Sequence, residues 1–279
     1  MLECVINISE GRDAGRLQTL RLLAGTSLLD LHADPDHHRC VLTMAGPADA
    51  LDAAVRAVTR WAVAELDLKG HDGVHPRLGV VDVVPWIDLD DPWSAATPES
   101  LSARRRFSEW AADELDLPCF WYGPERSLPD VRRTAWRSLR PEVGPPTPHP
   151  TAGAAAVGAR GALIAYNLWL TGGSLATARS VADAIRRPGL RTLGLAVSGG
   201  AQVSCNLTDP ANLGPEQAYD LVAGMVGMAG IARAELVGLL PRAVLDRIPQ
   251  QRWPDLDLRP AQTIEARLGA ARSSQPPVA

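Results

Sequence analysis

The chain has 279 residues and a formal net charge of -4 at pH 7. With 46% hydrophobic and 22% charged residues it can bury a sizeable core, which excludes wholesale disorder, and its mild acidity argues against a nucleic-acid-binding surface. No apolar run approaches the ~20 residues that span a bilayer, and the N-terminus lacks a basic segment followed by an apolar one, so we expect neither a membrane span nor a signal peptide.

The first part of the chain alternates between apolar runs and helix-forming stretches. We expect strands at residues 2–8, 27–32, 39–45 and 80–85, and helices at residues 16–24 and 47–66. In the longer helix Leu51, Val55, Val58 and Ala62 recur at helical spacing and predict a buried stripe. The resulting order is β–α–β–β–α–β.

The second half repeats that order after a short insertion. The insertion is expected to hold a helix, a strand and a helix, at residues 100–115, 118–122 and 129–139. Further strands are expected at residues 162–170, 190–197, 201–207 and 231–240, with helices at 174–187 and from residue 215 and a short helix from residue 241. Ser174 can cap its helix, and the Ser198–Gly199–Gly200 turn predicts a hairpin.

This repeated order predicts an α/β (α+β) protein of two ferredoxin-like βαββαβ subdomains. We expect helices on one face of each sheet and a ligand-binding cleft between the two subdomains. The proline-rich residues 141–153 separate the two halves, and we place the subdomains at residues 1–161 and 162–272. Residues 273–279 are expected to form a disordered tail.

The cysteines lie far apart, each in an apolar, strand-like segment and without C-x-x-C spacing. They are Cys4, Cys40, Cys119 and Cys205. Such cysteines are typical of reduced core thiols, so we expect a cytoplasmic protein.

All the histidines fall in the first 150 residues, in three loop groups. They are His32, His37, His38, His71, His75 and His149. Several loops that bring histidines to one place would make a site, whereas scattered, solvated loop histidines are the alternative. His71 and His75 have the spacing of a helical zinc pair, but Gly70, Gly73 and Pro76 argue against a helix, so no metal is expected.

Several segments in one collinear order resemble the formiminotransferase family. The segment ECVINISEG at residues 3–11 resembles the family's ECVPNxSEG, and GVHPRLGVVDVVP at 73–85 resembles GEHPRMGxxDVxPF. Residues 144–153, GAR at 158–160 and LIAYN at 163–167 resemble its folate-binding loop and the following GARxFLIAFN strand. AQVSCN at 201–206 resembles AQVSxN, and ELVGLLP at 235–241 resembles SQLVGLVP.

The resemblance implies a homodimer that transfers a formimino group from N-formimino-L-glutamate to tetrahydrofolate, in histidine breakdown and one-carbon metabolism. His75, by its place in the motif, is implied as the general base and then the general acid. Tetrahydrofolate is implied as a co-substrate. Its binding loop would consist of ten residues: Gly144, Pro145, Pro146, Thr147, Pro148, His149, Pro150, Thr151, Ala152 and Gly153.

Both substrates carry carboxylates, which arginines bind through bidentate pairs, and Arg39 and Arg77 lie nearest the matched motifs. The alternatives are that Arg39 caps a turn and that Arg77 holds Asp82. His32 and His38 occupy positions where the family has other polar residues, and we count them as candidate substrate-binding residues.

Two further positions depart from the family pattern. Ile6 replaces a proline, and Val74 replaces the glutamate before the predicted catalytic histidine. Because several polar positions have changed, a non-catalytic homologue that binds a folate or another acidic ligand is the alternative function. Metal-dependent hydrolysis by the additional histidines is a third.

Overall fold

The computed structural model describes residues 1–273, and the expected tail beyond them lies outside the described residues. The chain divides into two compact units, Met1–Gly161 and a second unit that begins at Ala162. Each unit holds one β-sheet and its own hydrophobic core, which confirms the mixed α/β class. Ser273 was expected in the tail, but it ends a helix, α8 (Ile264–Ser273), so that expectation was wrong for this residue.

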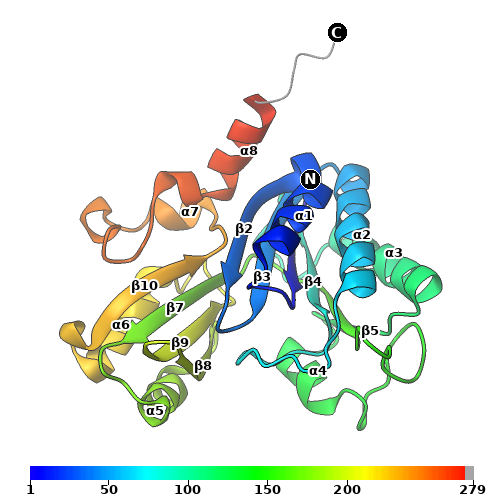
Figure 1. Cartoon of the computed structure of the whole chain (residues 1–279). Coiled ribbons are helices and arrows are strands. Elements are labelled where there is room, and N and C mark those ends of the chain that lie inside the picture. Colours follow the sequence, from blue (N-terminus) through cyan, green and yellow to red (C-terminus); the bar gives the residue numbers. More distant parts are fainter. Residues whose placement is uncertain (274–279) are drawn as a thin grey trace. The chain divides into compact units, whose positions relative to one another are not determined.

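The first unit is built on a six-stranded sheet. Its elements are β1 (Leu2–Ile8), α1 (Ala14–Ala24), β2 (Leu28–Asp34), β3 (Arg39–Gly46), α2 (Ala48–Glu65), β4 (Val81–Asp88), α3 (Pro98–Leu115), β5 (Cys119–Tyr122), α4 (Leu128–Thr134) and β6 (Ala155–Ala159). The strand order is β2–β3–β1–β4–β6–β5 (Figure 1). The pairs among β1 to β4 are antiparallel, whereas β6 is parallel to both β4 and β5. The expected β–α–β–β–α–β order is confirmed and then extended by two strands.

Helices α1, α2 and α3 share one core with the sheet. Leu51, Val55, Val58 and Ala62 of α2 are fully buried, which confirms the apolar stripe that the sequence predicted. The helices α2 and α3 lie side by side in Figure 1 and contact each other. Burying one such large aliphatic side chain contributes about 1.5–3 kcal/mol, so this stripe fixes α2 to the sheet.

The expectation that helices cover only one face of each sheet was wrong for α4. On β5, Cys119 packs into the core that contains α2 and α3, while Phe120 and Tyr122 pack with Val131 of α4. Successive strand residues point to opposite faces, so α4 covers the face opposite α2 and α3. The physical reason is the parallel pairing at this edge, since parallel strands are normally covered on both faces.

The second unit has a four-stranded antiparallel sheet in the order β10–β7–β9–β8. Its elements are β7 (Ile164–Leu170), α5 (Leu175–Ile185), β8 (Leu190–Val197), β9 (Gly200–Leu207), α6 (Pro215–Val226), β10 (Ile231–Val237) and α7 (Arg242–Leu245), followed by α8. The Ser174 side chain accepts the N–H of Thr177 at 3.1 Å and caps α5, as expected. The hairpin between β8 and β9 turns at Gly199, whose φ of 86° suits glycine.

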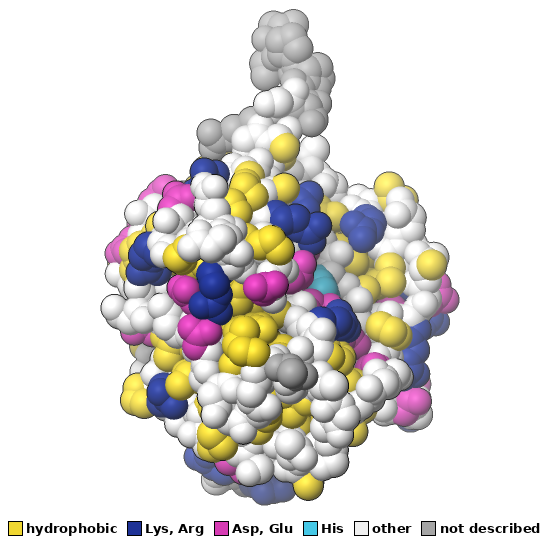
Figure 2. All heavy atoms as spheres, turned by 90° about the vertical axis from the view of Figure 1, so that its left-hand side faces the viewer, with side chains coloured by type: hydrophobic (Ala, Val, Ile, Leu, Met, Phe, Trp, Pro, Cys, Tyr) yellow, Lys and Arg dark blue, Asp and Glu magenta, His cyan; other side chains and the backbone are white. Residues whose placement is uncertain are grey.

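Charged side chains of both signs are interspersed over the face drawn in Figure 2 rather than gathered by sign. Within residues 1–273, no helix combines the length and the apolar character needed to cross a bilayer.

Candidate active site

The long loop between α2 and β4, residues 66–80, lies against the turn between β2 and β3. The N–H of Val74 donates to the carbonyl of Asp36 at 3.1 Å. Gly73 permits this approach, because a Cβ at that position would lie 2.2 Å from the carbonyl oxygen of His37. Only glycine tolerates such a contact with backbone. Gly73 therefore lets this segment pack closely against the turn.

Arg77 joins the same loop to the same turn. Its guanidinium donates to the carbonyls of His37 at 3.1 Å, Gly73 at 3.0 Å and His75 at 2.8 Å. Burial, followed by the charge of Arg39, lowers the pKa of Arg77 to about 10. The alternative was that Arg77 binds Asp82, but these hydrogen bonds of Arg77 go to backbone carbonyls. The side chain instead fixes the backbone of His75.

A buried ion-pair network adjoins this loop. The Oδ2 atom of Asp82 accepts from Arg39 at 2.5 Å and from Arg132 at 2.7 Å, and its Oδ1 accepts the N–H of Leu78 at 2.7 Å. Burial by itself would raise the pKa of Asp82, but the charges of Arg39 and Arg132 hold it well below its usual range. Removing one partner of a buried pair typically costs about 3–5 kcal/mol. Arg39 thus holds Asp82 rather than capping a turn.

His75 is half-buried, and several groups contact its ring. The Nδ1 atom lies 2.8 Å from the carbonyl oxygen of Pro76 and 3.2 Å from Nη1 of Arg39, and the ring centroid of His37 is 5.6 Å away. Burial, and then the charge of Arg39, hold the pKa of His75 well below its usual range. The ring is therefore neutral at pH 7 and able to accept a proton.

A second pair of histidines packs beside this network. The rings of His38 and His71 stack with centroids 4.2 Å apart. Nδ1 of His38 accepts the N–H of Gly11 at 3.2 Å and lies 3.6 Å from the buried carboxylate of Glu10. Burial is the largest cause that lowers the pKa of both His38 and His71. Although these rings lie together, no group of three or more His, Cys, Asp or Glu side chains among residues 1–273 is placed to hold a metal ion.

His32 lies on the same face of the sheet as Arg39. It pairs across from Val41, and Asp34 pairs across from Arg39. Because side chains alternate along a strand, this register places His32 and Arg39 on one face. On that face Nε of Arg39 donates to Oδ1 of Asn7 at 2.9 Å.

The end of the proline-rich loop at residues 144–153 packs against the segment that follows the predicted catalytic histidine. The N–H of Val80 donates to the carbonyl of Ala152 at 2.9 Å, and the N–H of Ala154 donates to that of Leu78 at 3.1 Å. The structure thus brings the two predicted loops together within the first unit.

The middle of the same loop is exposed, whereas its histidine stabilises a local turn. Nδ1 of His149 accepts the N–H of Ala152 at 3.0 Å, and the backbones of His149 and Gly153 exchange hydrogen bonds at 2.8 and 3.0 Å. Pro146, Thr147 and Pro148 are exposed. The loop is therefore fixed at its end and open at its tip.

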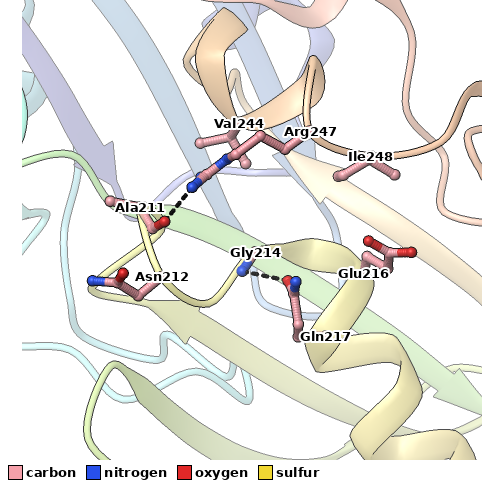
Figure 3. A pocket seen from close by; sticks show the side chains of 8 residues that line it. All are labelled: Ala211, Asn212, Gly214, Glu216, Gln217, Val244, Arg247 and Ile248. Carbon is pink, nitrogen blue, oxygen red and sulfur yellow. Dashed lines mark hydrogen bonds between the residues drawn. The ribbon is translucent and has the colours of Figure 1, made fainter.

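A small pocket of about 70 Å³ lies in the second unit, and none of the predicted site residues lines it. Figure 3 shows its lining side chains: Ala211, Asn212, Gly214, Glu216, Gln217, Val244, Arg247 and Ile248. Arg247 donates to the carbonyls of Ala211 and Pro210, and the side chain of Gln217 accepts the N–H of Gly214 at 2.8 Å. These polar groups satisfy one another and hold the N-terminal end of α6.

Sequence reasoning missed two members of the site. Arg132 reaches Asp82 from α4, across 50 positions of the chain, and no motif around Arg132 pointed to this contact. Glu10 was quoted only as part of the N-terminal motif, although its carboxylate is almost fully buried and faces His38. The sequence did offer one signal for Glu10, because this acidic residue comes directly before Gly11 and shortly before the helix α1.

The chain is similar to proteins of one family. A family model described as the formiminotransferase domain, N-terminal subdomain, matches residues 1–160. The glutamate formimidoyltransferase of Streptococcus pyogenes serotype M1 is 29% identical over 275 residues, which cover 88% of this chain and 91% of that protein. That of Thermoplasma acidophilum is 30% identical over 279 residues, covering 88% and 89%. The formimidoyltransferase-cyclodeaminase of Sus scrofa is 30% identical over 288 residues, covering 88% of this chain and 51% of that protein.

Proposed function

The chain belongs to the formiminotransferase family, and on that premise we propose that it transfers a formimino group from N-formimino-L-glutamate to tetrahydrofolate. The observation that carries the proposal is a neutral, half-buried histidine, His75, held by Arg77 and by the buried Arg39–Asp82–Arg132 network. Relatives named glutamate formimidoyltransferase align over most of the chain and support the same reaction.

In the proposed reaction His75 moves one proton between two nitrogens. It removes the proton from N5 of tetrahydrofolate as the new bond from N5 to the formimino carbon forms. It then gives that proton to the glutamate nitrogen as the bond from that nitrogen to the same carbon breaks. A histidine whose pKa is near or below neutrality can serve as base and then as acid, and such catalysis typically contributes about 10²–10⁴-fold in rate.

The charge of the site suits acidic substrates. Around Asp82 two arginines face one carboxylate, so Arg39 and Arg132 leave a positive excess beside His75. We propose that a substrate carboxylate approaches this excess, and that Arg39, Arg77, His32 and His38 are its candidate contacts.

For the folate, we propose binding along the loop at residues 144–153. Its end is fixed against Leu78 and Val80, and its exposed tip is rich in proline. A loop that is ordered before the ligand arrives loses less conformational entropy on binding.

We further propose how the chain is divided into subdomains and how it assembles. Residues 1–161 and 162–272 would be the N-terminal and C-terminal formiminotransferase subdomains of a cytoplasmic homodimer. Buried free thiols such as Cys4 and Cys119 fit a reducing compartment.

One feature favours the non-catalytic alternative, in which the protein binds a folate without turnover. Val74 is 42% exposed where the family has a glutamate, so no carboxylate adjoins His75 from that side. The purified protein should be mixed with tetrahydrofolate and N-formimino-L-glutamate, and 5-formiminotetrahydrofolate should be measured. Catalytic formation of that product supports the transferase, whereas binding of tetrahydrofolate without any turnover supports the alternative.

A further inference from the structure

Two groups compete for one ring nitrogen of His75. The carbonyl oxygen of Pro76 lies 2.8 Å from Nδ1, and Nη1 of Arg39 lies 3.2 Å from the same atom. A carbonyl oxygen can only accept a hydrogen bond and a guanidinium can only donate one. Nδ1 must therefore carry a proton to satisfy Pro76 and must lack one to satisfy Arg39.

The distances decide in favour of Pro76. An oxygen and a nitrogen 2.8 Å apart with no proton between them would bring two lone pairs together, whereas a proton on Nδ1 makes this contact a normal hydrogen bond. Arg39 does not depend on His75, because Nη1 already donates to Asp82 and Nε donates to Asn7. The neutral ring thus keeps its proton on Nδ1 and leaves Nε2 without one.

Arg132 holds the accepting carbonyl in place. Its Nη1 donates to the oxygen of Pro76 at 2.9 Å, and its Nη2 donates to Oδ2 of Asp82 at 2.7 Å. The same carboxylate oxygen also binds Arg39. One guanidinium therefore connects the carbonyl that selects the tautomer to the carboxylate that engages the competing arginine.

From this geometry we infer that Arg132 is a positioning residue that holds His75 in the Nδ1–H tautomer, so that Nε2 is the atom that exchanges protons with the substrates. The second half of this statement rests on the proposed function, whereas the tautomer itself does not. Arg132 comes from α4, and its hydrogen bonds to Pro76 and Asp82 connect it to the ring of His75. Its charge also lowers the pKa of that ring. Without Arg132 the carbonyl of Pro76 loses its anchor, and the contact with Arg39 favours the other tautomer.

The direct test is nitrogen NMR of the resting protein, with ¹⁵N-labelled histidine and no substrate, at a pH above the His75 transition. The His75 resonances are assigned by their loss in His75→Gln. Three variants are compared with the unsubstituted protein. Arg132→Met removes both hydrogen bonds, and Arg132→Lys keeps the charge but replaces the planar, two-armed donor with a single ammonium. Arg133→Met is the matched control, because Arg133 is on the same helix, is 67% exposed and forms its ion pair with Asp130.

We expect the unsubstituted protein and Arg133→Met to show a protonated Nδ1 and a bare Nε2. Arg132→Met should shift the ring toward the Nε2–H form and lower kcat about tenfold, whereas Arg132→Lys, which keeps the positive charge, should leave KM for either substrate nearly unchanged. Arg132→Lys should restore only part of the tautomer preference. A ring that is Nε2–H in the unsubstituted protein, or that stays Nδ1–H in Arg132→Met with unchanged kcat, overturns the inference.

The two claims fail separately. A protein without formimino transfer whose His75 still depends on Arg132 for its tautomer contradicts the proposed function and supports the inference about the ring. An active protein whose His75 is Nε2–H contradicts the inference and leaves the transferase function in place.

Discussion

At the scale of single residues, the site keeps His38, His71 and His75 neutral by surrounding them with arginines and by removing water. Burial is the largest cause that lowers the pKa of His38, of His71 and of His75, and positive charge from nearby arginines adds to it in each case. The buried carboxylate of Asp82 is ionised for the opposite reason, since two arginines outweigh the effect of its burial. The same charges that make His75 a base therefore also link the stability of the fold to pH.

We expect the protein to lose stability as the pH falls below the ordinary histidine range. Because these three pKa values are lowered on folding, the unfolded chain binds more protons than the native state below about pH 6.5, and the free energy of unfolding decreases there. Folding also lowers the pKa of Asp82, so its ionised carboxylate stabilises the native state at neutral pH. That stabilisation is lost only as the pH falls below about 4. The decline between pH 6.5 and 5.5 thus reports the histidines, whereas Glu10 and Glu125, whose pKa values folding also lowers, add to it near pH 4.5.

Urea unfolding at pH 7.5 and 5.5 measures this decline. The variant His38→Gln should show a smaller difference between the two pH values than the unsubstituted protein. A free energy of unfolding that is constant or rises over this interval would contradict the charge assignment.

At the scale of elements, the site depends on two loops that regular strands and helices hold in place. The sequence predicts the strands β1 and β3 and the helix α2 well, because long apolar periods report burial directly. It does not predict β6, whose residues are small, fully buried and without alternation, so its pattern does not distinguish a strand from a linker. Nor does it predict that α4 delivers Arg132, since that contact depends on a parallel strand pair closing the sheet edge.

The candidate site itself divides in the same way. The position of His75 was predicted from its motif, and the contacts of His37 with His75 and of His38 with His71 join two of the three histidine-bearing loops. His149, in the third loop, bonds its own turn. The role of Arg77 does not follow, because a guanidinium that binds backbone carbonyls and one that binds a substrate look the same in a sequence. The hydrogen bond from Arg77 to the carbonyl of His37 spans 40 positions of the chain. Because every residue has a backbone carbonyl, the type of the accepting residue does not reveal such a contact in the sequence.

Gly73→Ala tests the close approach of the loop at residues 66–80 to the turn at His37. The added Cβ would lie 2.2 Å from a carbonyl oxygen and 2.6 Å from Nη2 of Arg77, so the loop must move. We expect a loss of about 1–3 kcal/mol in stability and a fall in kcat of at least tenfold. Gly224→Ala, in α6 with open space around it, is the control and should be neutral or slightly stabilising. Equal effects of the two substitutions would show that the close approach does not matter.

Replacing Pro146 and Pro148 together by glycine tests the proposal that the loop at residues 144–153 binds folate. Both prolines are exposed, so their loss removes backbone restriction and no buried contact. We expect KM for tetrahydrofolate to rise about two- to fivefold per proline, with KM for the donor and kcat nearly unchanged. Pro254→Gly, an exposed proline of the second unit, should leave all three constants unchanged. An unaltered KM for tetrahydrofolate in the double variant would remove this loop from the folate site.

At the scale of the whole molecule, the predicted site residues all fall within the first unit, Met1–Gly161. The second unit has an independent core and a sheet of its own. Its four strands repeat the β–α–β–β–α–β order of the first unit, which suggests that each unit can form its sheet from nearby segments of chain.

The molecular mass of the protein in solution tests the proposed homodimer. Light scattering of the purified protein should give twice the chain mass of 29.8 kDa, unchanged over a tenfold dilution from micromolar concentration. A mass of one chain throughout the dilution series would contradict the proposed assembly.

The central claim is that His75 carries the proton in formimino transfer. The measurement that tests it most directly is the rate of 5-formiminotetrahydrofolate formation by the unsubstituted protein and by His75→Gln, together with the Kd of each for tetrahydrofolate. We predict that the substitution lowers kcat by about 10²–10⁴-fold and leaves the Kd for tetrahydrofolate nearly unchanged. Equal turnover by the two proteins would contradict the account.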